Sequence, residues 1–539
     1  MRKRYSLGTV VVVTAIGLLA GAMLNNLFSG DNIYEQVNKF SDVLSITYKY
    51  YVESVDTQQL TEAAINGVLG ELDPHSVYIS KEQLGRVNEQ FQGEFEGIGI
   101  EFQVLNDTLL VVSPIAGGPS EALGIQSGDK IVKINDTSAI GITQRGVQEK
   151  LRGPKGTKVK VSVHRAGFPD LMEFEITRDK IPIYTVDASF MVDEKVGYVN
   201  VSRFAAKTHS EFVDAVGQLK EAGMRRLILD LRGNAGGYLE QAFKMADELM
   251  PGGKKIVYTK GRRPEFDDEF VSSGEGKYQD LSLVVLVSNG SASASEIVAG
   301  AVQDWDRGLI VGETTFGKGL VQRQFDLRDG SAFRLTTARY FTPSGRLIQR
   351  PFDSDPGSYH REAFTREEQE GENIEHEVEQ DSSRETFTTA GGRTVYGGGG
   401  ITPDYIVKAA RLNEYTARLR RGLVFLEFAD KYLDRYGQTL REEYGDHQVD
   451  RFVREFLLTE DMLGEIRAIA EAKEIAFDEK LYNEDLPFIK SFAKAYIARG
   501  LWANNGYVRV MLEQDAQFAK AVELFPEAEA IAGNLLGSH

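Results

Sequence analysis

Ser293 and Lys318 are the residues whose type and setting could carry out hydrolysis. Ser293 stands in the segment SASASEI at 291–297, and Lys318 stands in FGKG at 316–319. A serine hydroxyl attacks a carbonyl carbon when a base removes its proton, and a neutral lysine amine can be that base. The two segments therefore predict a hydrolase with a Ser/Lys dyad.

The serine is predicted to lie at a turn between a strand and a helix. Residues 281–287 are an apolar, valine-rich run that ends before Asn289 and Gly290, and apolar residues then recur at helical spacing over 297–305. Near a helix N-terminus, free N–H groups and the helix dipole stabilise negative charge, including that of an acyl-transfer oxyanion. The alternative is that these serines only cap the helix, a common role of serine.

Lys318 must be neutral to act as a base. The ordinary lysine pKa of ~10.4 has to fall by several units, and burial can lower it that far. Gly317 and Gly319 permit a close approach of the backbone, and residues 309–312 predict a buried strand that leads into the loop. Glycine-flanked lysines also occur in solvated turns, so this alternative stays open.

Composition excludes several classes of protein and site. The chain has no cysteine, which excludes thiol catalysis, disulfides and cysteine metal sites. None of the 7 histidines lies in the serine or lysine segment, although a histidine from elsewhere could approach them in the fold. A formal net charge of −18 without a basic cluster argues against nucleic-acid binding. A chain of 539 residues predicts several domains.

The ordered motifs of the chain resemble those of the C-terminal processing peptidases, which are serine peptidases with a Ser/Lys dyad and an embedded PDZ domain. The resemblance runs from about residue 73 to 403, through LDPHS (72–76), GIG (97–99), LRGNAGG (231–237), the serine and lysine segments, and TPSGR (342–346). It implies that Ser293 is the nucleophile, Lys318 the general base and Gln322 the residue that orients the lysine. Gln322 suits that role if the loop curls or begins a helix. No metal and no cofactor is implied.

A βαβα succession is predicted for the catalytic domain. Strands are expected at 196–204 and 227–231, and helices at 209–222 and 238–250. After the second strand, the N–H groups of the glycine loop 233–237 could face an anion. The resemblance implies Gly236 or Gly237 as one oxyanion donor and the N–H of Ala294 as the other. The alternatives are a phosphate-binding loop or a plain tight turn, but the loop has neither dinucleotide nor P-loop spacing, and it lacks the P-loop lysine.

Residues 94–178 predict a separate module. Its expected strands are 98–102, 108–114, 129–134, 158–165 and 173–177, and its expected helices lie around 120–123 and 143–151. The segment of Gly97, Ile98, Gly99 and Ile100 resembles the PDZ loop whose backbone N–H groups bind the free C-terminus of a peptide. Arg152 could couple the module to the catalytic domain, or it could be a solvated loop charge.

The two ends of the chain predict location and additional packing. Arg2, Lys3 and Arg4 precede an apolar stretch at 7–24, which predicts a signal peptide or an uncleaved anchor. A small-residue cleavage pattern at 20–22 is present, but the apolar run continues past it, which favours anchoring. Positive-inside bias then puts the catalytic part outside the cytoplasm, in the periplasm at the inner membrane.

Two further segments carry less information. Residues 353–400, acidic and then glycine-rich, predict an exposed insertion. Residues 412–539 predict amphipathic helices that could pack on the core, dimerise or bind a partner.

The predicted architecture is multidomain α/β, with a βα-rich crotonase-like catalytic core, an inserted PDZ domain and a helical C-terminal region. The predicted domains are a signal peptide or anchor (1–30), an N-terminal helical region (31–93), the PDZ domain (94–180), the catalytic domain (181–410) and the helical C-terminal domain (411–539).

The predicted function is a serine endopeptidase that cleaves extracytoplasmic proteins near their C-termini. Its expected partners are protein or peptide substrates with free C-termini, the membrane through the N-terminal segment, and further copies of itself in a homo-oligomer. Two competing hypotheses remain open: a non-catalytic PDZ-containing scaffold, and a small-molecule hydrolase on the same fold.

Overall fold

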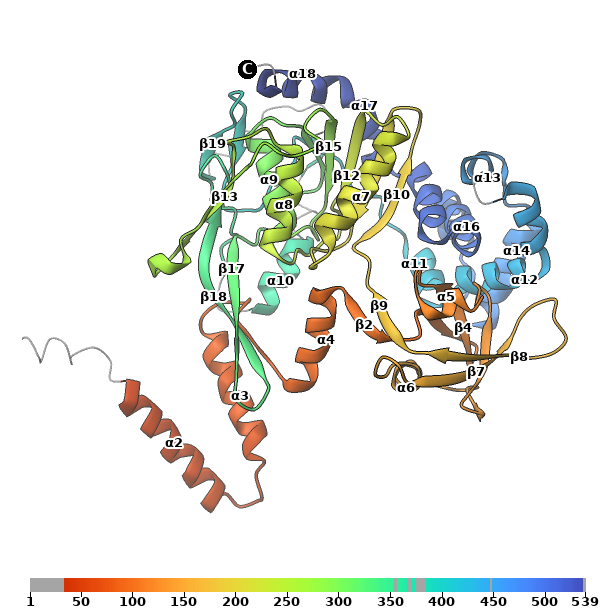
Figure 1. The fold of residues 1–539 in the computed structure, drawn as a ribbon, viewed down its shortest axis with the longest axis horizontal. Coiled ribbons are helices and arrows are strands. Elements are labelled where there is room, and N and C mark those ends of the chain that lie inside the picture. Colours follow the sequence, from red (N-terminus) through yellow and green to blue (C-terminus); the bar gives the residue numbers. More distant parts are fainter. Residues whose placement is uncertain (1–32, 353–355, 366–370, 374–383, 446–447, 537–539) are drawn as a thin grey trace, which may run out of the picture. The chain divides into compact units, whose positions relative to one another are not determined.

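The computed structural model describes residues 33–352, 356–365, 371–373, 384–445 and 448–536. The chain divides into two compact units, Met1–Leu72 and Asp73–His539. Figure 1 shows the order of the helices and strands along the chain.

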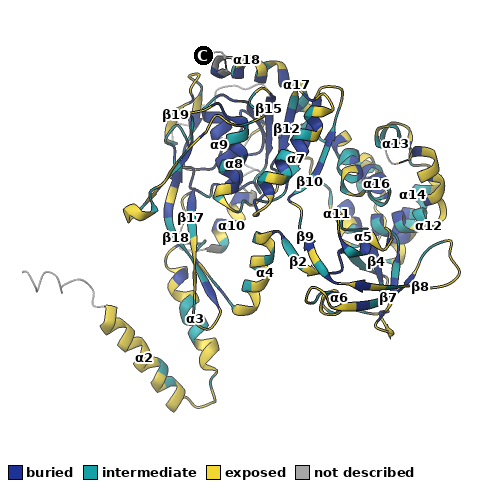
Figure 2. Ribbon diagram, viewed as in Figure 1, coloured by how far each residue is buried: buried dark blue, intermediate teal, exposed yellow. Residues whose placement is uncertain are grey.

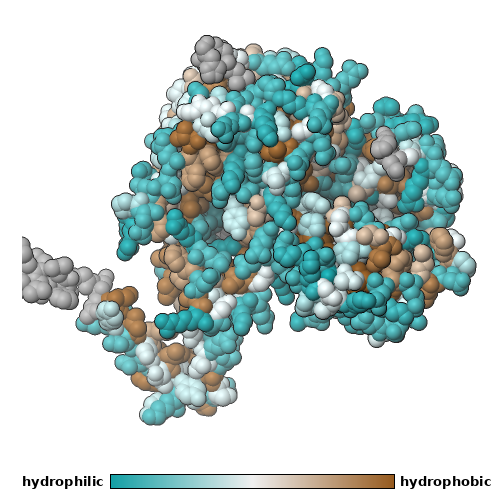
Figure 3. All heavy atoms as spheres, in the orientation of Figure 1, coloured by the Kyte–Doolittle hydropathy of each residue, from teal (hydrophilic) through white to brown (hydrophobic). Residues whose placement is uncertain are grey.

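The described part of the first unit consists of helices α2 (Ile33–Tyr50) and α3 (Thr57–Gly70). Helix α2 buries no residue, and Figure 3 shows apolar side chains at its surface. The stretch predicted to be a signal peptide or anchor lies outside the described residues. Within the ranges that are described, no helix is both long enough and apolar enough to cross a membrane.

A six-stranded sheet carries the serine turn. Its order is β10 (Val186–Met191), β11 (Val196–Val201), β12 (Arg226–Asp230), β15 (Ser282–Val287), β16 (Leu309–Gly312) and β21 (Tyr405–Ile406). Strands β11 to β21 run parallel, whereas β10 is antiparallel to β11. Every residue of β15 is buried, as expected for a parallel strand covered on both faces. The predicted strands at 196–204, 227–231, 281–287 and 309–312 are confirmed.

Helices α7 (Thr208–Glu221), α8 (Leu239–Leu249) and α9 (Ala294–Asp304) pack against this sheet. Every residue of α9 is buried, whereas α8 is buried only along the side that includes Ala242, Met245 and Leu249 (Figure 2). Val298 of α9 and Val285 of β15 belong to the same apolar cluster. The predicted helices are confirmed, and α9 is a central helix, not an amphipathic surface helix.

A second sheet delivers the lysine loop. It is ordered β1 (Val77–Ile79), β18 (Ala332–Phe341), β13 (Lys255–Gly261) and β14 (Glu269–Val271), and β17 (Leu320–Asp326) also pairs with β18. Lys318 stands between β16 of the first sheet and β17 of the second. Strand β1 lies within the region 31–93 that the sequence predicts to be helical.

The PDZ module has its own core. Strands β3 (Ile100–Leu105), β4 (Thr108–Pro114), β5 (Lys130–Ile134), β6 (Thr137–Ser138), β7 (Lys158–His164) and β8 (Met172–Thr177) form one sheet, accompanied by α5 (Pro119–Ala122) and α6 (Gln144–Leu151). Leu109, Ile131 and Val161 are fully buried in its apolar cluster. Strand β2 (Glu94–Gly97) pairs with β9 (Asp179–Pro182) where the chain enters and leaves the module. The predicted elements of the module are confirmed.

The C-terminal helices contribute residues to two apolar clusters. The first group is α11 (Glu414–Arg421), α12 (Val424–Tyr444), α13 (Val449–Glu455), α14 (Glu460–Ala472), α15 (Glu479–Glu484) and α16 (Leu486–Met511), which share a cluster of their own. The last helices, α17 (Ala516–Glu523) and α18 (Phe525–Leu536), pack against the catalytic sheet, where Phe525 joins Val284 and Leu309. Packing on the core is therefore correct for these last two helices.

The prediction of an exposed insertion at 353–400 holds for many of the residues that the structure describes there, but the segment is also anchored to the core. Helix α10 (Pro356–Thr365) buries Tyr359 and Ala363, and the hairpin of β19 (Thr386–Thr388) and β20 (Thr394–Tyr396) buries Val395. The acidic composition hides these contacts, because a few apolar residues without periodicity suffice when they meet an apolar surface that the rest of the fold provides.

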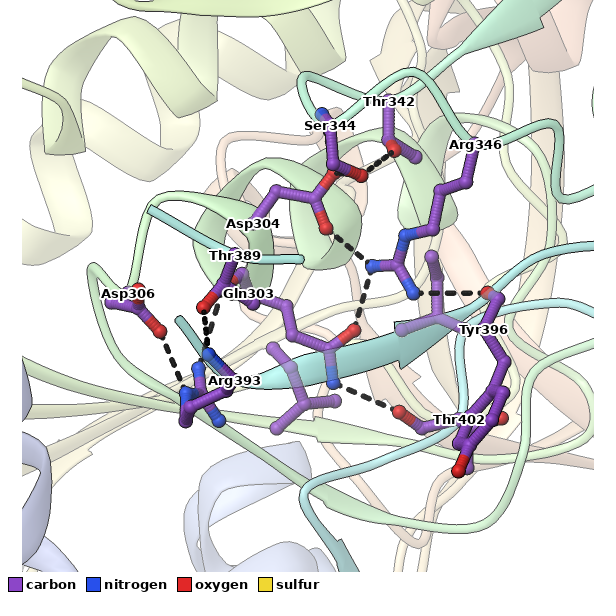
Figure 4. Close-up of polar contacts among 12 residues, drawn as sticks. Gln303, Asp304, Asp306, Thr342, Ser344, Arg346, Thr389, Arg393, Tyr396 and Thr402 are labelled. Carbon is purple, nitrogen blue, oxygen red and sulfur yellow. Dashed lines mark hydrogen bonds and ion pairs between the residues drawn. The ribbon is translucent and has the colours of Figure 1, made fainter. Parts of the chain in front are cut away.

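Arg346 ties the β19–β20 hairpin to the C-terminal end of α9 (Figure 4). Its guanidinium donates to Gln303 Oε1 (2.7 Å), Asp304 Oδ1 (2.6 Å) and the carbonyl oxygen of Tyr396 (3.2 Å). Ser344 donates to the second oxygen of Asp304 from its N–H (3.0 Å) and its hydroxyl (2.7 Å). A positive charge at the C-terminal end of a helix also interacts favourably with the helix dipole. The TPSGR segment therefore anchors the helix whose other end carries the serine.

We predict that Arg346→Met destabilises the protein by about 3–5 kcal/mol, because it leaves the Asp304 carboxylate buried without its cation. Both side chains of this pair are 0% exposed. Arg421→Met is the control, since Arg421 and Glu414 form a pair that is 65% and 68% exposed, and exposed pairs contribute at most about 1 kcal/mol. Thermal unfolding measures both effects, and equal midpoints for Arg346→Met and the unmodified chain would contradict the prediction.

Candidate active site

Ser293 occupies the turn between β15 and α9, directly before the first helical residue. Its backbone has φ 54° and ψ −110°, which is a strained conformation for a residue with a side chain. Such conformations cost on the order of 1–3 kcal/mol and persist only where the surrounding structure enforces them. The turn lies at the carboxyl edge of the parallel strands, where α/β folds place their reactive groups.

Of the three serines in this segment, Ser293 alone donates its hydroxyl to no carbonyl oxygen of the described residues. Ser291 Oγ donates to the carbonyl oxygen of Leu231 and Ser295 Oγ to that of Asn234, each at 2.8 Å, and both side chains are fully buried. Ser293 and Glu296 form a capping box in which the Ser293 side chain faces the N–H of Glu296, but the hydroxyl donates to no carbonyl oxygen among the described residues. Helix capping therefore stays open as an alternative to the predicted role of Ser293 as nucleophile.

The carboxylate of Glu296 joins the serine turn to the lysine loop. Its Oε2 accepts the N–H of Ser293 (2.7 Å) and of Lys318 (2.9 Å), and its Oε1 accepts the Thr315 hydroxyl (2.6 Å) and the N–H of Gly317 (2.7 Å). Burial raises the pKa of Glu296, and these four donors oppose the shift. The sequence analysis missed this role, although the Ser-x-x-Glu spacing of a capping box could have indicated it.

Lys318 has the electrostatic setting of a base. Burial and, to a smaller extent, the positive charge of Arg334 lower its pKa from 10.5 to about 8, while Glu296 and Asp73 oppose the shift. A lysine with this pKa is partly neutral at mildly alkaline pH. The alternative of a solvated turn lysine does not fit this burial.

Gln322 lies on strand β17, so the expectation of a curled loop or a helix start is wrong. The β17–β18 register shifts between Val321 and Gln322, and Gln322 Nε2 donates to Thr336 Oγ1 at 3.4 Å. The segment is extended because it pairs with β18, an antiparallel strand that the local sequence does not reveal. The register shift is a β-bulge in this pairing. Within the described chain, the polar partner of Gln322 is Thr336 and not Lys318.

The LDPHS segment contacts strand β18, which carries Thr336. Asp73 accepts the Ser76 hydroxyl at 2.7 Å, and Ser76 Oγ accepts the N–H of Thr336 at 3.2 Å. Both Asp73 and Ser76 are buried. The segment therefore braces β18 beside Gln322 and places a carboxylate in the field of Lys318.

The glycine loop passes directly beside the serine. A β-carbon added at Gly236 would lie 2.8 Å from Ser293 Cβ, so only glycine fits there. The N–H of Gly236 already donates to Asn234 Oδ1 at 2.9 Å. By contrast, the N–H groups of Gly237 and Ala294 have no hydrogen-bond partner among the residues that the structure describes.

The predicted peptide loop of the PDZ module connects β2 to β3. Gly99 has φ 76°, and the carbonyl oxygen of Ile98 accepts the N–H (3.1 Å) and hydroxyl (2.6 Å) of Ser120. The side chains of Ile98 and Ile100 are buried in the module. The N–H groups of Ile98 and Gly99 have no partner within the described part of the chain, which leaves them available to a carboxylate.

Arg152 contacts helix α4 (Lys81–Gln92), which precedes the PDZ module in the chain. Its guanidinium donates to Glu89 Oε2 at 2.6 Å and lies 4.5 Å from the ring centre of Phe95. Both partners of the ion pair are about one-third to two-fifths exposed, at 36% for Glu89 and 40% for Arg152. Coupling of the module to the catalytic domain through Arg152 stays a prediction.

Comparisons with known proteins agree on one family. Residues 195–355 match peptidase family S41, residues 87–164 a PDZ domain, residues 22–83 the N-terminal domain of the activating protease CtpB, and residues 415–504 a family of unknown function. A probable CtpA-like serine protease of Staphylococcus aureus (strain N315) is 36% identical over 349 residues, which are 64% of this chain and 69% of that protein. A carboxy-terminal-processing protease of Bartonella bacilliformis is 38% identical over 322 residues, which are 59% and 74%.

Among solved structures, a photosystem II D1 C-terminal processing protease is 32% identical and has a TM-score of 0.32, covering 57% of this chain and 82% of that one. By these relationships of sequence, the chain belongs to the carboxy-terminal-processing serine proteases of peptidase family S41 and carries a PDZ domain.

Proposed function

We propose that this chain is an endopeptidase with a Ser293/Lys318 dyad that cleaves extracytoplasmic proteins near their C-termini, with the PDZ domain holding the tail. The observation that carries the proposal is the shared carboxylate of Glu296, which accepts the backbone N–H of both residues. Membrane attachment through residues 1–30 and assembly into a homo-oligomer are part of the proposal and rest on the sequence pattern.

The proposed reaction uses the amine of Lys318 as a proton carrier. Neutral Nζ takes the proton from Ser293 Oγ as the oxygen attacks the scissile carbonyl carbon, and the resulting ammonium then protonates the leaving amine. Water, deprotonated by the same amine, hydrolyses the acyl-enzyme and restores the serine. Gln322 is proposed to orient the lysine from β17, which requires its amide to leave Thr336, its partner in this structure.

The oxyanion of the tetrahedral intermediate is assigned to the N–H groups of Gly237 and Ala294. Two preorganised donors of this kind stabilise charge that develops only in the transition state. Gly236 instead supplies the space that the serine turn needs, because its own N–H is bonded to Asn234.

Ser293→Ala is expected to lower kcat by on the order of 10⁶-fold, the scale for loss of a serine nucleophile, without loss of folding. Ser291→Ala and Ser295→Ala are matched controls, because each removes a buried hydroxyl from the same segment. Cleavage of a peptide substrate and reaction with a fluorophosphonate probe measure the effect. Full activity of Ser293→Ala would contradict the dyad and point to another hydrolytic centre, whereas absence of activity in the unmodified chain would favour the scaffold.

Lys318→Arg should be about as damaging as Lys318→Ala, with a loss of about 10²- to 10⁴-fold, since arginine stays protonated and cannot accept the serine proton. In the unmodified enzyme, kcat/KM should rise with pH and level off above about 8, because deprotonation of Lys318 creates the active form. A pH profile measured on a peptide substrate tests both statements. Near-normal turnover by Lys318→Arg would show that another group is the base.

The PDZ assignment predicts that a free C-terminal carboxylate strengthens binding. Amidation of that carboxylate should weaken peptide binding by roughly 1–3 kcal/mol, the scale of lost hydrogen bonds to a charged group. Calorimetry on the full chain carrying Ser293→Ala compares the two peptides without cleavage. Equal affinities would show that the module recognises something other than the chain end.

A further inference from the structure

Tyr359 of α10 packs against both segments of the proposed active site, although it comes from the insertion. It is 4% exposed and shares a small buried cluster with Ala292, Phe316 and Ala363. Ala292 directly precedes Ser293, and Phe316 lies in the loop of Lys318. One helix of the insertion therefore contacts the backbone segments that hold the nucleophile and the base.

The Tyr359 hydroxyl belongs to a hydrogen-bonded chain that ends at the lysine loop. Gln349 Oε1 accepts the N–H of Gly319 at 2.9 Å. The amide nitrogen Nε2 of Gln349 is therefore a donor. Gln349 Nε2 donates to the Tyr359 hydroxyl at 3.0 Å. The hydroxyl also forms a hydrogen bond with His75 Nε2 at 3.1 Å, in which the histidine tautomer decides the donor. Burial raises the pKa of Tyr359, so the hydroxyl keeps its proton in the alkaline range where Lys318 becomes neutral.

The Tyr359 ring supports the other side of the loop. Its centre lies 5.7 Å from that of Phe316, with the planes at 83°. The guanidinium of Arg350 lies 4.2 Å from the Tyr359 ring centre and 4.9 Å from that of Phe316. The N–H of Arg350 donates to the carbonyl oxygen of Gly317 at 2.9 Å. The residues on either side of Lys318 are thus held by Gln349 and Arg350, and both of these contact Tyr359.

We infer that Tyr359 is a positioning residue for proteolysis, whose ring and hydroxyl hold the loop 316–319 so that Lys318 stays dry and aligned with Ser293. This inference rests on the proposed function, since it needs Lys318 to be the base. It also gives a role to His75 of the LDPHS segment and to the insertion, neither of which contributes a reacting group.

The consequence for catalysis follows from hydration. Without the ring, the loop loosens and water reaches Lys318, whose pKa of about 8 then rises toward its ordinary 10.5. Less of the amine is neutral at a given pH, and the amine is less well placed. The rate of the chemical step should therefore fall while substrate binding changes little.

The test compares Tyr359→Phe and Tyr359→Ala with Tyr436→Phe and Tyr436→Ala in the full chain. Tyr436 is 47% exposed and lies in helix α12, so it controls for loss of a tyrosine as such. We expect Tyr359→Phe to lower kcat about tenfold with an unshifted pH profile, because only the hydroxyl's hydrogen bonds are lost. We expect Tyr359→Ala to lower kcat on the order of 10²-fold and to move the rise of kcat/KM to higher pH. KM should stay near that of the Tyr436 variants, whereas the unfolding midpoint should fall in Tyr359→Ala, because a buried ring is removed.

The shift of the kcat/KM profile to higher pH is the decisive measurement. General destabilisation lowers the amount of active enzyme but does not move the pH profile. A Tyr359→Ala enzyme with unchanged kcat and pH profile would overturn the inference, as would a loss explained entirely by fewer titratable active sites. If Tyr359→Ala does not fold, wild-type kcat in Tyr359→Phe overturns it. Ser293→Ala in the same assay separates the two proposals: residual full activity defeats the dyad, whereas an inactive Ser293→Ala beside fully active Tyr359 variants defeats only this inference.

Discussion

The buried carboxylate of Glu296 is the interaction on which the arrangement of the active site depends. A carboxylate removed from water is unstable unless hydrogen-bond donors replace its hydration. Here the turn after β15 and the loop after β16 supply four such donors, two of which are the N–H groups of Ser293 and Lys318. Because β15 and β16 are neighbouring parallel strands, both segments leave the sheet at the same edge. The need to solvate one charge therefore fixes the distance between two stretches of backbone that carry the proposed chemistry.

Rigid surroundings explain how the strained turn at Ser293 persists. Helix α9 is buried along its entire length, and the Arg346–Asp304 pair secures its far end. Gly236 lies against the turn and leaves room for it, since any side chain there would overlap Ser293. Strain at one residue is tolerated when many other contacts determine the same backbone path. Ser291 and Ser295 donate their hydroxyls to the carbonyl oxygens of Leu231 and Asn234, and the Ser293 hydroxyl makes no corresponding bond among the described residues.

The PDZ module and the insertion serve the same centre in different ways. The module has its own apolar core, and the N–H groups of Ile98 and Gly99 in its β2–β3 loop have no partner among the residues that the structure describes. The proposed recognition of a chain end by this loop therefore requires no residue from the catalytic sheet. The insertion has no core of its own in its described parts. Its helix α10 is stabilised by contacts with the lysine loop, and its β19–β20 hairpin by contacts with the end of α9. The described parts of the insertion therefore depend on the lysine loop and on the end of α9 for their position, and they support these two segments in turn.

Local sequence determined the strands and helices around the proposed site and singled out Ser293 and Lys318 as candidates. The valine-rich run of β15, the helical spacing of α9 and the glycine-flanked Lys318 are short-range patterns, and each is legible within about a dozen residues. The alternation of short strands in the PDZ module is equally local, which is why its elements were predicted within a few residues of their bounds. These features follow from backbone preferences and from which side of an element is apolar.

Only the tertiary structure decided which donors, acceptors and rings meet. Gln322 was expected in a curled loop or helix but lies on β17, because β18 is its partner. The N–H of Gly236 is used by Asn234, which leaves Gly237 as the candidate donor. Tyr359 lies in a segment that composition predicts to be exposed, yet its hydroxyl forms a hydrogen bond with His75, 284 residues away. Contacts between such distant residues depend on the summed packing of many elements, and no single stretch of the sequence encodes them.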